Sequence, residues 1–439
     1  MRYIVILLFL IQLSTSAQQH QTKGQNVRKK QLPSLSADKE LLSLIEDSSF
    51  IYNDAKKFKV LDKISRIDYY NIRKYPESIR KLSSYNKQIE RTDNEFYISI
   101  LRLDAFTSYR SGSYIEAQSK LKNYLLLYKD YYKNDTSFAF EFSKYSYCFL
   151  KTNQQELFFS YIDSALYIAH KKQNPNHDLS ITYFTSSIYY MNLRQADTSR
   201  TLLNKAINHW ELSNKLDFRL KYYLHQKLAY AELYDGNLQL SQQNFEIAEE
   251  NLLKIDHTET ELASLLLDKS TPLLLSNKLI QCIKQLKMAL HIFESEKPLR
   301  QRDISTAHEY LGLCYKNLGE IHQAETHFMK SIKANSNSSN LSFRNLANVY
   351  FFTKENKKAD SLFQISIDYF KNIKEPTDYQ RAMTNFMYGQ FLIENDFNKV
   401  EGEKHLKKAI SEWFDHFNGP HENMSTPLNI LGTHYLLTG

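Results

Sequence analysis

Glycine, proline and cysteine are all scarce in this sequence, which contains 10 Gly, 8 Pro and 3 Cys among 439 residues. A β-sheet protein of this length would need many more turn residues, so the composition favours an all-helical chain. The three cysteines, Cys148, Cys282 and Cys314, are odd in number and far apart in the sequence. They indicate neither a disulfide framework nor a metal cluster, and we interpret them as small apolar core residues.

Motifs that carry catalysis are missing as well. The sequence has no Gly-rich phosphate-binding loop and no G-x-S-x-G nucleophile motif. His308 and Glu309 lack the second histidine of a zinc-protease helix, and His322 and His327 are five residues apart, which does not place them on one helical face. We therefore predict that the chain is not an enzyme and holds no cofactor or metal.

The N-terminus has the features of an export signal. Arg2 precedes the apolar run YIVILLFLIQL, and Thr15 and Ala17 occupy the two positions that a signal peptidase reads. Residues 1–17 are therefore predicted to be a signal peptide of an exported protein in the periplasm, on the cell surface or secreted. The alternative is an uncleaved membrane anchor, although a run of about eleven apolar residues is short for a span of ~20. No Cys precedes Cys148, so the protein is not expected to be a lipoprotein, and no later stretch is apolar enough to predict a transmembrane span.

The segment after the leader is polar and basic. Residues 18–37 contain no acidic side chain and four basic ones, Lys23, Arg28, Lys29 and Lys30. We predict a basic flexible tether here. With Arg2, these residues account for five of the formal net charge of +7 and leave +2 for residues 38–439. The body therefore lacks the basic stripe expected of a nucleic-acid-binding protein. Residues 38–96 are predicted to form a degenerate helical N-terminal cap.

Small and large apolar residues recur at a fixed spacing over the rest of the chain. The clearest copy, LGLCYKNLGEIHQAETHFMKS, starts at Leu311 and has the spacing L-G-x2-Y-x3-G-x4-A-x3-F-x2-small. One anchor residue marks each copy: Ala117, Phe158, Ser199, Ser241, Cys282, Ala324, Ala359 and Gly402. Successive anchors are 41, 41, 42, 41, 42, 35 and 43 residues apart, and this regularity is typical of an internal repeat.

The pattern resembles the tetratricopeptide repeat (TPR), over about residues 97–439. The resemblance implies an all-α fold, a right-handed α-solenoid of stacked helical hairpins, because a single two-helix repeat cannot bury its apolar face alone. Most copies exceed the usual 34 residues by seven or eight, or about two helical turns, and in this respect they are similar to kinesin light chain repeats. Small residues such as Gly312 are expected where two helices cross.

The resemblance also implies a ligand surface, since ligands in this family usually lie along the concave face made by the first helix of each repeat. On this chain that face would bind a protein or peptide partner, with rings burying its side chains and amides pairing with its backbone. Arg344 and Asn348 look like half of the carboxylate clamp that some members use. The alternative is that these groups only pack one repeat on the next. The residues predicted to bind are Lys227, Tyr230, Tyr234, Tyr310, Arg344, Asn345 and Asn348.

The last residues reproduce the opening of another repeat, with Leu431, Gly432 and Tyr435 at the matching positions. We predict that the solenoid ends in a half repeat whose apolar face, including Leu431, Tyr435 and Leu436, is exposed and could self-associate. The C-terminal segment that contains it, FNGPHENMSTPLNILGTHYLLTG, resembles bacterial repeats that precede a CHAT peptidase domain. A C-terminal capping helix is the alternative structure. The function predicted is an exported scaffold that binds protein or peptide partners; the alternative is the sensing or binding region of a larger signalling or CHAT-peptidase protein.

Overall fold

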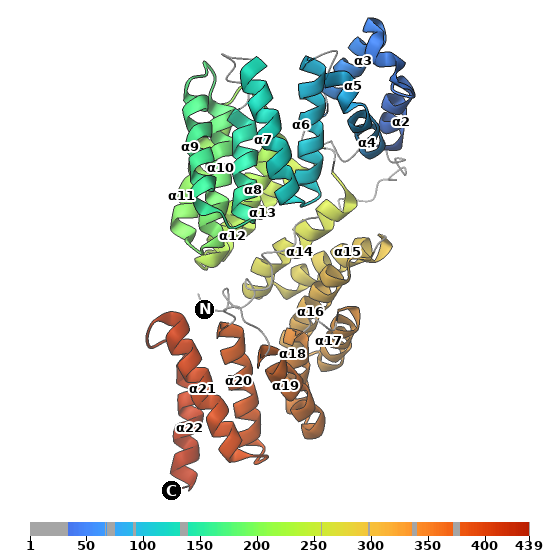
Figure 1. Cartoon of the computed structure of the whole chain (residues 1–439). Coiled ribbons are helices and arrows are strands. Elements are labelled where there is room, and N and C mark those ends of the chain that lie inside the picture. The colour runs from blue at the N-terminus through green and yellow to red at the C-terminus, as the bar shows by residue number, and fades with distance from the viewer. Residues whose placement is uncertain are drawn as a thin grey trace. The chain divides into compact units, whose positions relative to one another are not determined.

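The computed structural model describes residues 34–65, 67, 75–90, 94–131, 139–255, 257–296, 299–335, 340–371 and 378–438. In these residues every regular element is a helix and none is a strand (Figure 1). No helix in these ranges is long and apolar enough to cross a membrane. The predicted signal peptide (1–17) and most of the predicted tether (18–37) lie outside the described residues, although α2 begins at Ser34, within the predicted tether.

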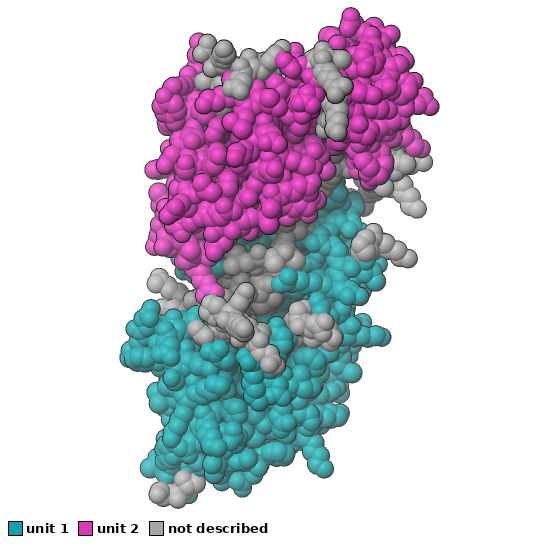
Figure 2. Space-filling model, viewed as in Figure 1, with its two compact units in different colours: residues 1–22, 225–439 teal, residues 23–224 magenta. Residues whose placement is uncertain are grey.

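The chain separates into two compact units, which Figure 2 colours separately. Unit 2 spans residues 23–224, and unit 1 comprises residues 225–439 with residues 1–22. The helices of unit 2 are α2 (Ser34–Leu44), α3 (Asp54–Ser65), α4 (Pro76–Ser84), α5 (Asn86–Glu90), α6 (Asn94–Arg110), α7 (Tyr114–Tyr131), α8 (Ala139–Lys151), α9 (Gln155–His170), α10 (Asn176–Asn192) and α11 (Ala196–Glu211), with the 3-10 helix η1 (Ser48–Tyr52). Helix α12 (Phe218–Tyr234) crosses the boundary between the units.

Unit 1 continues with the same alternation of helices. They are α13 (Leu238–Leu252), α14 (Glu259–Leu275), α15 (Leu279–Ser295), α16 (Gln301–Asn317), α17 (Ile321–Ala334), α18 (Asn340–Phe352), α19 (Asn356–Lys371), α20 (Asp378–Glu394), α21 (Lys399–Phe417) and α22 (Ser425–Thr438), with the 3-10 helix η3 (Glu422–Met424).

Each of the eight sequence anchors lies buried in the second helix of a two-helix repeat, from α6–α7 through α20–α21. Repeat length follows helix length: α15 and α16 each have 17 residues, whereas α17 has 14 and α18 has 13. This difference explains why the anchors Ala324 and Ala359 are closer in sequence than the others. The additional residues of the long repeats therefore extend the helices, as the sequence predicts.

The turn within each of these repeats contains one residue with a left-handed backbone. These residues are Gly112, Asn153, Arg194, Gly236, Asn277, Gly319, Lys354 and Asp396, with φ between 54° and 81°. A side chain disfavours this conformation, which is why glycine is expected there. Only three of the eight are glycine, so this chain forms the same turn with residues that pay a conformational cost.

The first helices of unit 1 lie deeper than the second helices. Helix α14 is buried without interruption from Leu262 to Leu274, whereas its partner α15 buries a single stripe. Within unit 1, α14 contacts α16, α16 contacts α18, and α18 contacts α20. First helices that touch one another directly form the inner layer of this stack, as expected of an α-solenoid.

Close packing at the helix crossings depends on small residues. A Cβ atom on Gly312 would lie 2.6 Å from the Phe328 ring, so α16 and α17 could not approach as they do with a larger residue there. The prediction that Gly312 lies at a crossing is confirmed. The three cysteines are buried and unbridged, in agreement with their interpretation as core residues.

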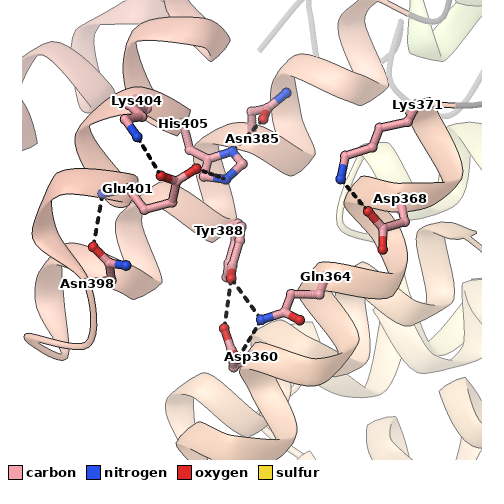
Figure 3. Close-up of polar contacts among 10 residues, drawn as sticks. All are labelled: Asp360, Gln364, Asp368, Lys371, Asn385, Tyr388, Asn398, Glu401, Lys404 and His405. Carbon is pink, nitrogen blue, oxygen red and sulfur yellow. Dashed lines mark hydrogen bonds and ion pairs between the residues drawn. The ribbon is translucent and has the colours of Figure 1, made fainter.

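A recurring hydrogen bond joins successive repeats in unit 1. In each case a tyrosine hydroxyl on a first helix donates to a carboxylate on the preceding second helix, one residue after the anchor. The pairs are Tyr350 with Glu325 (2.7 Å), Tyr388 with Asp360 (2.8 Å) and Tyr435 with Glu403 (2.6 Å). Figure 3 shows the second pair, in which Gln364 also reaches the Tyr388 hydroxyl.

This bond identifies the role of α22, because Tyr435 attaches α22 to α21 as Tyr388 attaches α20 to α19. Helix α22 also contacts α20. It therefore packs as the first helix of a further repeat. The expected exposure of Leu431 is wrong: this residue is 5% exposed because it faces the preceding hairpin, whereas Leu436 is 87% exposed as predicted.

In unit 2, the described part of residues 38–96, the predicted N-terminal cap of the solenoid, contains helices. A side chain of α2 caps the N-terminus of α4 there. Asp38 on α2 accepts hydrogen bonds from the backbone N–H groups of Glu77 (3.2 Å) and Ser78 (3.0 Å). These N–H groups are at the start of α4, where they have no partner within the helix. Asp38 thereby fixes α4 to α2.

Candidate binding surface

The seven predicted ligand-binding residues all lie on first helices, as the sequence analysis expects, but most of them are buried. Lys227 and Tyr234 on α12 are half-buried. Tyr310 on α16 is completely buried. The remaining four are 3–8% exposed: Tyr230 on α12, and Arg344, Asn345 and Asn348 on α18. A ligand role for these residues stays a prediction.

Arg344 makes its polar contacts with neighbouring repeats. Its Nη1 donates to the Gln380 Oε1 on α20 at 2.8 Å. Burial lowers the pKa of Arg344 to about 10, and the nearby Glu309 on α16 opposes this shift. These contacts agree with the alternative for this side chain, that it ties one repeat to the next. Its partner in the predicted clamp, Asn348, is buried one helical turn away.

Buried polar groups connect the first helices of unit 1. Between α12 and α14, the Gln226 Nε2 donates to the Asp268 Oδ2 at 3.1 Å. Between α18 and α16, the Ser342 Oγ donates to the Glu309 Oε2 at 3.2 Å. We call these groups, together with the Arg344 pair, the inner polar seam; it comprises Gln226, Asp268, Glu309, Ser342, Arg344 and Gln380. Arg344 was predicted from its spacing as a binding residue, but the spacing did not show that it bonds Gln380 or that Gln226 bonds Asp268.

Two carboxyl groups of the seam are perturbed. Burial raises the pKa of Asp268 to about 7, against the opposing effects of Tyr230 and Lys227. Burial also raises the pKa of Glu309 to about 7, although Arg344 and Ser342 favour its charged form. Desolvation dominates in both because a buried carboxylate loses its water. Burial therefore favours the protonated form of both carboxyl groups.

In the part of the chain that the structure describes, no three His, Cys, Asp or Glu side chains are grouped to hold a metal ion. The predictions that the chain is not an enzyme and binds no metal or cofactor stay predictions.

One polar pair was missed by sequence reasoning. The Nδ1 atoms of His308 on α16 and His327 on α17 are 3.0 Å apart, and the Tyr315 ring stacks on His327. Burial lowers the pKa of each histidine to about 4. The two residues are 19 positions apart and meet because the hairpin folds α17 back on α16. Aligning the two helices of one hairpin would have identified them.

A groove lies between α20 and α22, both first helices, with a volume of about 550 Å³. Its lining contains apolar and polar side chains and three charged ones: Glu394 at the end of α20, Asp396 in the α20–α21 turn and Lys399 at the start of α21. Its lining residues are Ile393, Glu394, Asp396, Lys399, Thr426, Asn429, Ile430, Thr433, His434 and Leu437. Sequence reasoning did not select these residues, because the groove exists only where α22 packs beside α20.

Comparison with known proteins establishes the fold. No protein-family model matches the sequence, and no curated protein is similar to it. Among solved structures, the apo form of RapI matches with a TM-score of 0.58 at 12% identity, over 76% of this chain and 96% of RapI. A Rap protein complexed with Competence and Sporulation Factor matches with a TM-score of 0.51 at 12% identity, over 76% of this chain and 96% of that protein. The structural neighbours are TPR-repeat proteins, so the predicted TPR-type α-solenoid is confirmed.

Proposed function

We propose that this chain is an exported scaffold that binds a segment of a partner protein on the first-helix side of unit 1. The observation that carries the proposal is the groove between α20 and α22. Its volume of about 550 Å³ lies in the range typical of ligand sites, about 300–1,000 Å³.

The lining of the groove suits an extended peptide. Ile393 and Ile430 offer apolar contacts for alternate side chains, and Asn429 offers an amide that can pair with a peptide backbone. Glu394, Asp396 and Lys399, from the end of α20 to the start of α21, add charged groups to the lining, so they would orient a peptide that carries a charged residue.

The predicted residues on α12, α16 and α18 enter this proposal in two roles. Lys227, whose Nζ lies 5.1 Å from the centre of the Tyr230 ring, and Tyr234 are accessible enough to extend the binding surface. The buried residues of the predicted set, including Tyr310 and Arg344, would pack beneath this binding surface and support it. The complex of a Rap protein with Competence and Sporulation Factor is a precedent for binding by this fold.

The proposal can be tested by selecting binders from a random peptide library displayed on phage, using the mature chain as bait. Thr433→Arg should fill the groove and reduce capture of the selected peptides at least about tenfold, the effect of losing roughly 1.4 kcal/mol. Gln239→Arg adds the same charge on an exposed site of α13 and should change nothing. Equal capture by both variants would refute the groove.

A second variant separates the groove from the predicted surface on α12 and α18. Replacing Tyr230, Tyr234, Arg344 and Asn348 together by Ala should reduce capture only if that surface contributes. Circular dichroism must show unchanged helicity, because Tyr230, Arg344 and Asn348 are buried. If both variants capture the selected peptides as well as the wild type does, the first-helix side of unit 1 is excluded as the binding surface.

Export is the other half of the proposal and rests on the leader sequence. Mass spectrometry of the protein from its native host should find a mature N-terminus at Gln18. A cytosolic protein that retains Met1 would contradict export. The alternative, a binding region of a larger signalling or CHAT-peptidase protein, is supported by the sequence resemblance of the C-terminal segment and by the packing of α22 as a first helix. The gene sequence after the codon for Gly439 would decide between them.

A further inference from the structure

Helix α22 has one buried face and one exposed apolar face. Leu431 and His434 are 5% and 9% exposed and face the preceding repeat. On another side of the helix, Leu428 is 53% exposed and Leu436 is 87% exposed, with Gly432 between them. We call Leu428, Gly432 and Leu436 the Gly432 face.

In the earlier repeats, the corresponding face of the first helix is covered by its own second helix. A Cβ on Gly312 would strike the Phe328 ring of α17. A Cβ on Gly389 would come within 2.9 Å of both the Gly402 carbonyl oxygen and the Leu406 side chain of α21. A Cβ on Gly432 would meet nothing within 4 Å. The Gly432 face thus has the shape of a helix crossing, and none of the described residues occupies it.

The helix that would fit this face is specified by the α20–α21 crossing. There, α21 presents a glycine followed four residues later by a leucine, Gly402 and Leu406, against Gly389. Helix α22 carries the same pair at the same spacing, Gly432 and Leu436. It therefore has both the surface that receives a second helix and the residues that a second helix presents.

We propose that α22 pairs with α22 of a second copy of this chain, antiparallel about a twofold axis at Gly432. In this pairing the two Gly432 backbones meet as Gly389 and Gly402 meet within one chain. Leu436 of each copy covers the Gly432 of the other and lies beside its Leu428. A twofold interface requires such a self-complementary patch.

Charge and position are compatible with this pairing. Helix α22 contains no Asp, Glu, Lys or Arg, so it brings no like charges of its own to the axis. Burial of the exposed leucines removes apolar area from water on both copies. The groove lies on a different side of α22, along Thr426, Ile430 and Leu437, and stays open in the dimer.

Sedimentation equilibrium of the mature chain tests the proposal. The wild-type chain should sediment as a dimer at tens of micromolar. Gly432→Leu should weaken the dimer about 10- to 100-fold, the effect of 1–3 kcal/mol of overpacking. It should not lower the thermal stability of the monomer, because the space around Gly432 is open in a single chain and leucine favours a helix more than glycine does. Leu437→Glu is the matched control: this leucine is 82% exposed but lies outside the Gly432 face, so the dimer should persist.

Disulfide cross-linking tests the antiparallel geometry. An equimolar mixture of Leu428→Cys and Leu436→Cys chains should form a cross-linked heterodimer, whereas Leu436→Cys alone should cross-link poorly. The three native cysteines are buried and should not interfere. A strictly monomeric wild type, a dimer unaffected by Gly432→Leu, or preferential cross-linking of Leu436→Cys with itself would overturn the proposal.

Discussion

The backbones of Gly389 in α20 and Gly402 in α21 lie directly against each other. A Cβ on Gly389 would be 2.9 Å from the Gly402 carbonyl oxygen, and a Cβ on Gly402 would be 3.0 Å from the Gly389 carbonyl oxygen. Two helices can approach this closely only where neither has a side chain. The last sequence anchor, Gly402, which follows Ala359 by 43 residues, therefore lies where α20 and α21 are in direct contact.

Replacing Gly389 by Ala should destabilise unit 1, although Ala favours helices. The added methyl group meets backbone and cannot be accommodated by a rotamer change, so the free energy of unfolding should fall by about 1–3 kcal/mol. Urea denaturation followed by circular dichroism measures this change. The matched control is Gly432→Ala, measured at a concentration at which the chain is monomeric; its methyl group then has open space, and the variant should gain up to about 1 kcal/mol from helix propensity. Equal effects of the two substitutions would show that the α20–α21 crossing is looser than described.

Arg194 should be replaceable by Gly with a gain in stability. It is exposed and has a left-handed backbone with φ of 60°. Removing the side chain relieves a conformational cost of about 1 kcal/mol. The neighbouring Leu193, with φ of −82°, has no such strain, so Leu193→Gly should lower the melting temperature where Arg194→Gly raises it. A lower melting temperature for Arg194→Gly would contradict this account of the turn.

Removing the Tyr388 hydroxyl should weaken the contact between the α18–α19 and α20–α21 repeats. Tyr388→Phe loses the hydrogen bond to Asp360 and leaves that carboxylate with one donor fewer, at a cost of about 1–2 kcal/mol. Tyr52→Phe, at a residue that is 69% exposed, serves as the control and should have no measurable effect. A double-mutant cycle with Asp360→Ala, which removes the acceptor, should give a coupling energy of the same size, and additive effects would mean that the bond contributes nothing.

The His308–His327 pair should make the free energy of unfolding fall as the pH is lowered. Burial lowers the pKa of both residues from 6.5 to about 4, and Lys330 adds to this shift in each. In the unfolded chain these histidines take up protons below pH 6.5, while the folded pair stays neutral until about pH 4. The stability they contribute is fully present above pH 6.5 and is lost as the pH falls to 4.

Urea denaturation between pH 7 and pH 4.5 measures this loss. The variant with both histidines replaced by Gln should lose less stability than the wild type over that interval. A parallel decline in the two proteins would assign the acid sensitivity to other groups.

Asp268 should have the opposite pH dependence. Burial raises its pKa from 3.8 to about 7, so the folded state favours the protonated carboxyl. Its contribution to stability is fully present below pH 3.8 and is lost as the pH rises to 7. Asp268→Asn keeps the shape and removes the titration, so the variant should gain stability relative to the wild type between pH 5 and pH 8. If the difference in unfolding free energy between Asp268→Asn and the wild type is constant over this range, Asp268 is ionised in the folded protein throughout the range.

Sequence spacing predicted the repeats because helix packing imposes it. Only small residues fit at a crossing, so anchors such as Ala324 and glycines such as Gly312 recur wherever two helices must touch. The glycine turns at Gly112, Gly236 and Gly319 followed from the same pattern. The turns at Arg194 and Lys354 did not, because the surrounding helices impose a backbone conformation that these side chains disfavour.

The candidate binding residues were harder to predict. The sequence located Tyr310 and Arg344 on first helices, but it could not show that Tyr310 is fully enclosed or that Arg344 bonds Gln380. Exposure depends on how closely neighbouring first helices approach, and this is decided by contacts between repeats.

By itself, the sequence determined that this protein is a stack of helical hairpins, because the periodic placement of small and large residues is a local property of each repeat. The tertiary structure decided which groups meet across repeats. It joined His308 to His327, enclosed Leu431 while leaving Leu436 exposed, and formed the groove between α20 and α22. These outcomes depend on the distances and rotations between packed helices, which arise only when the hairpins stack.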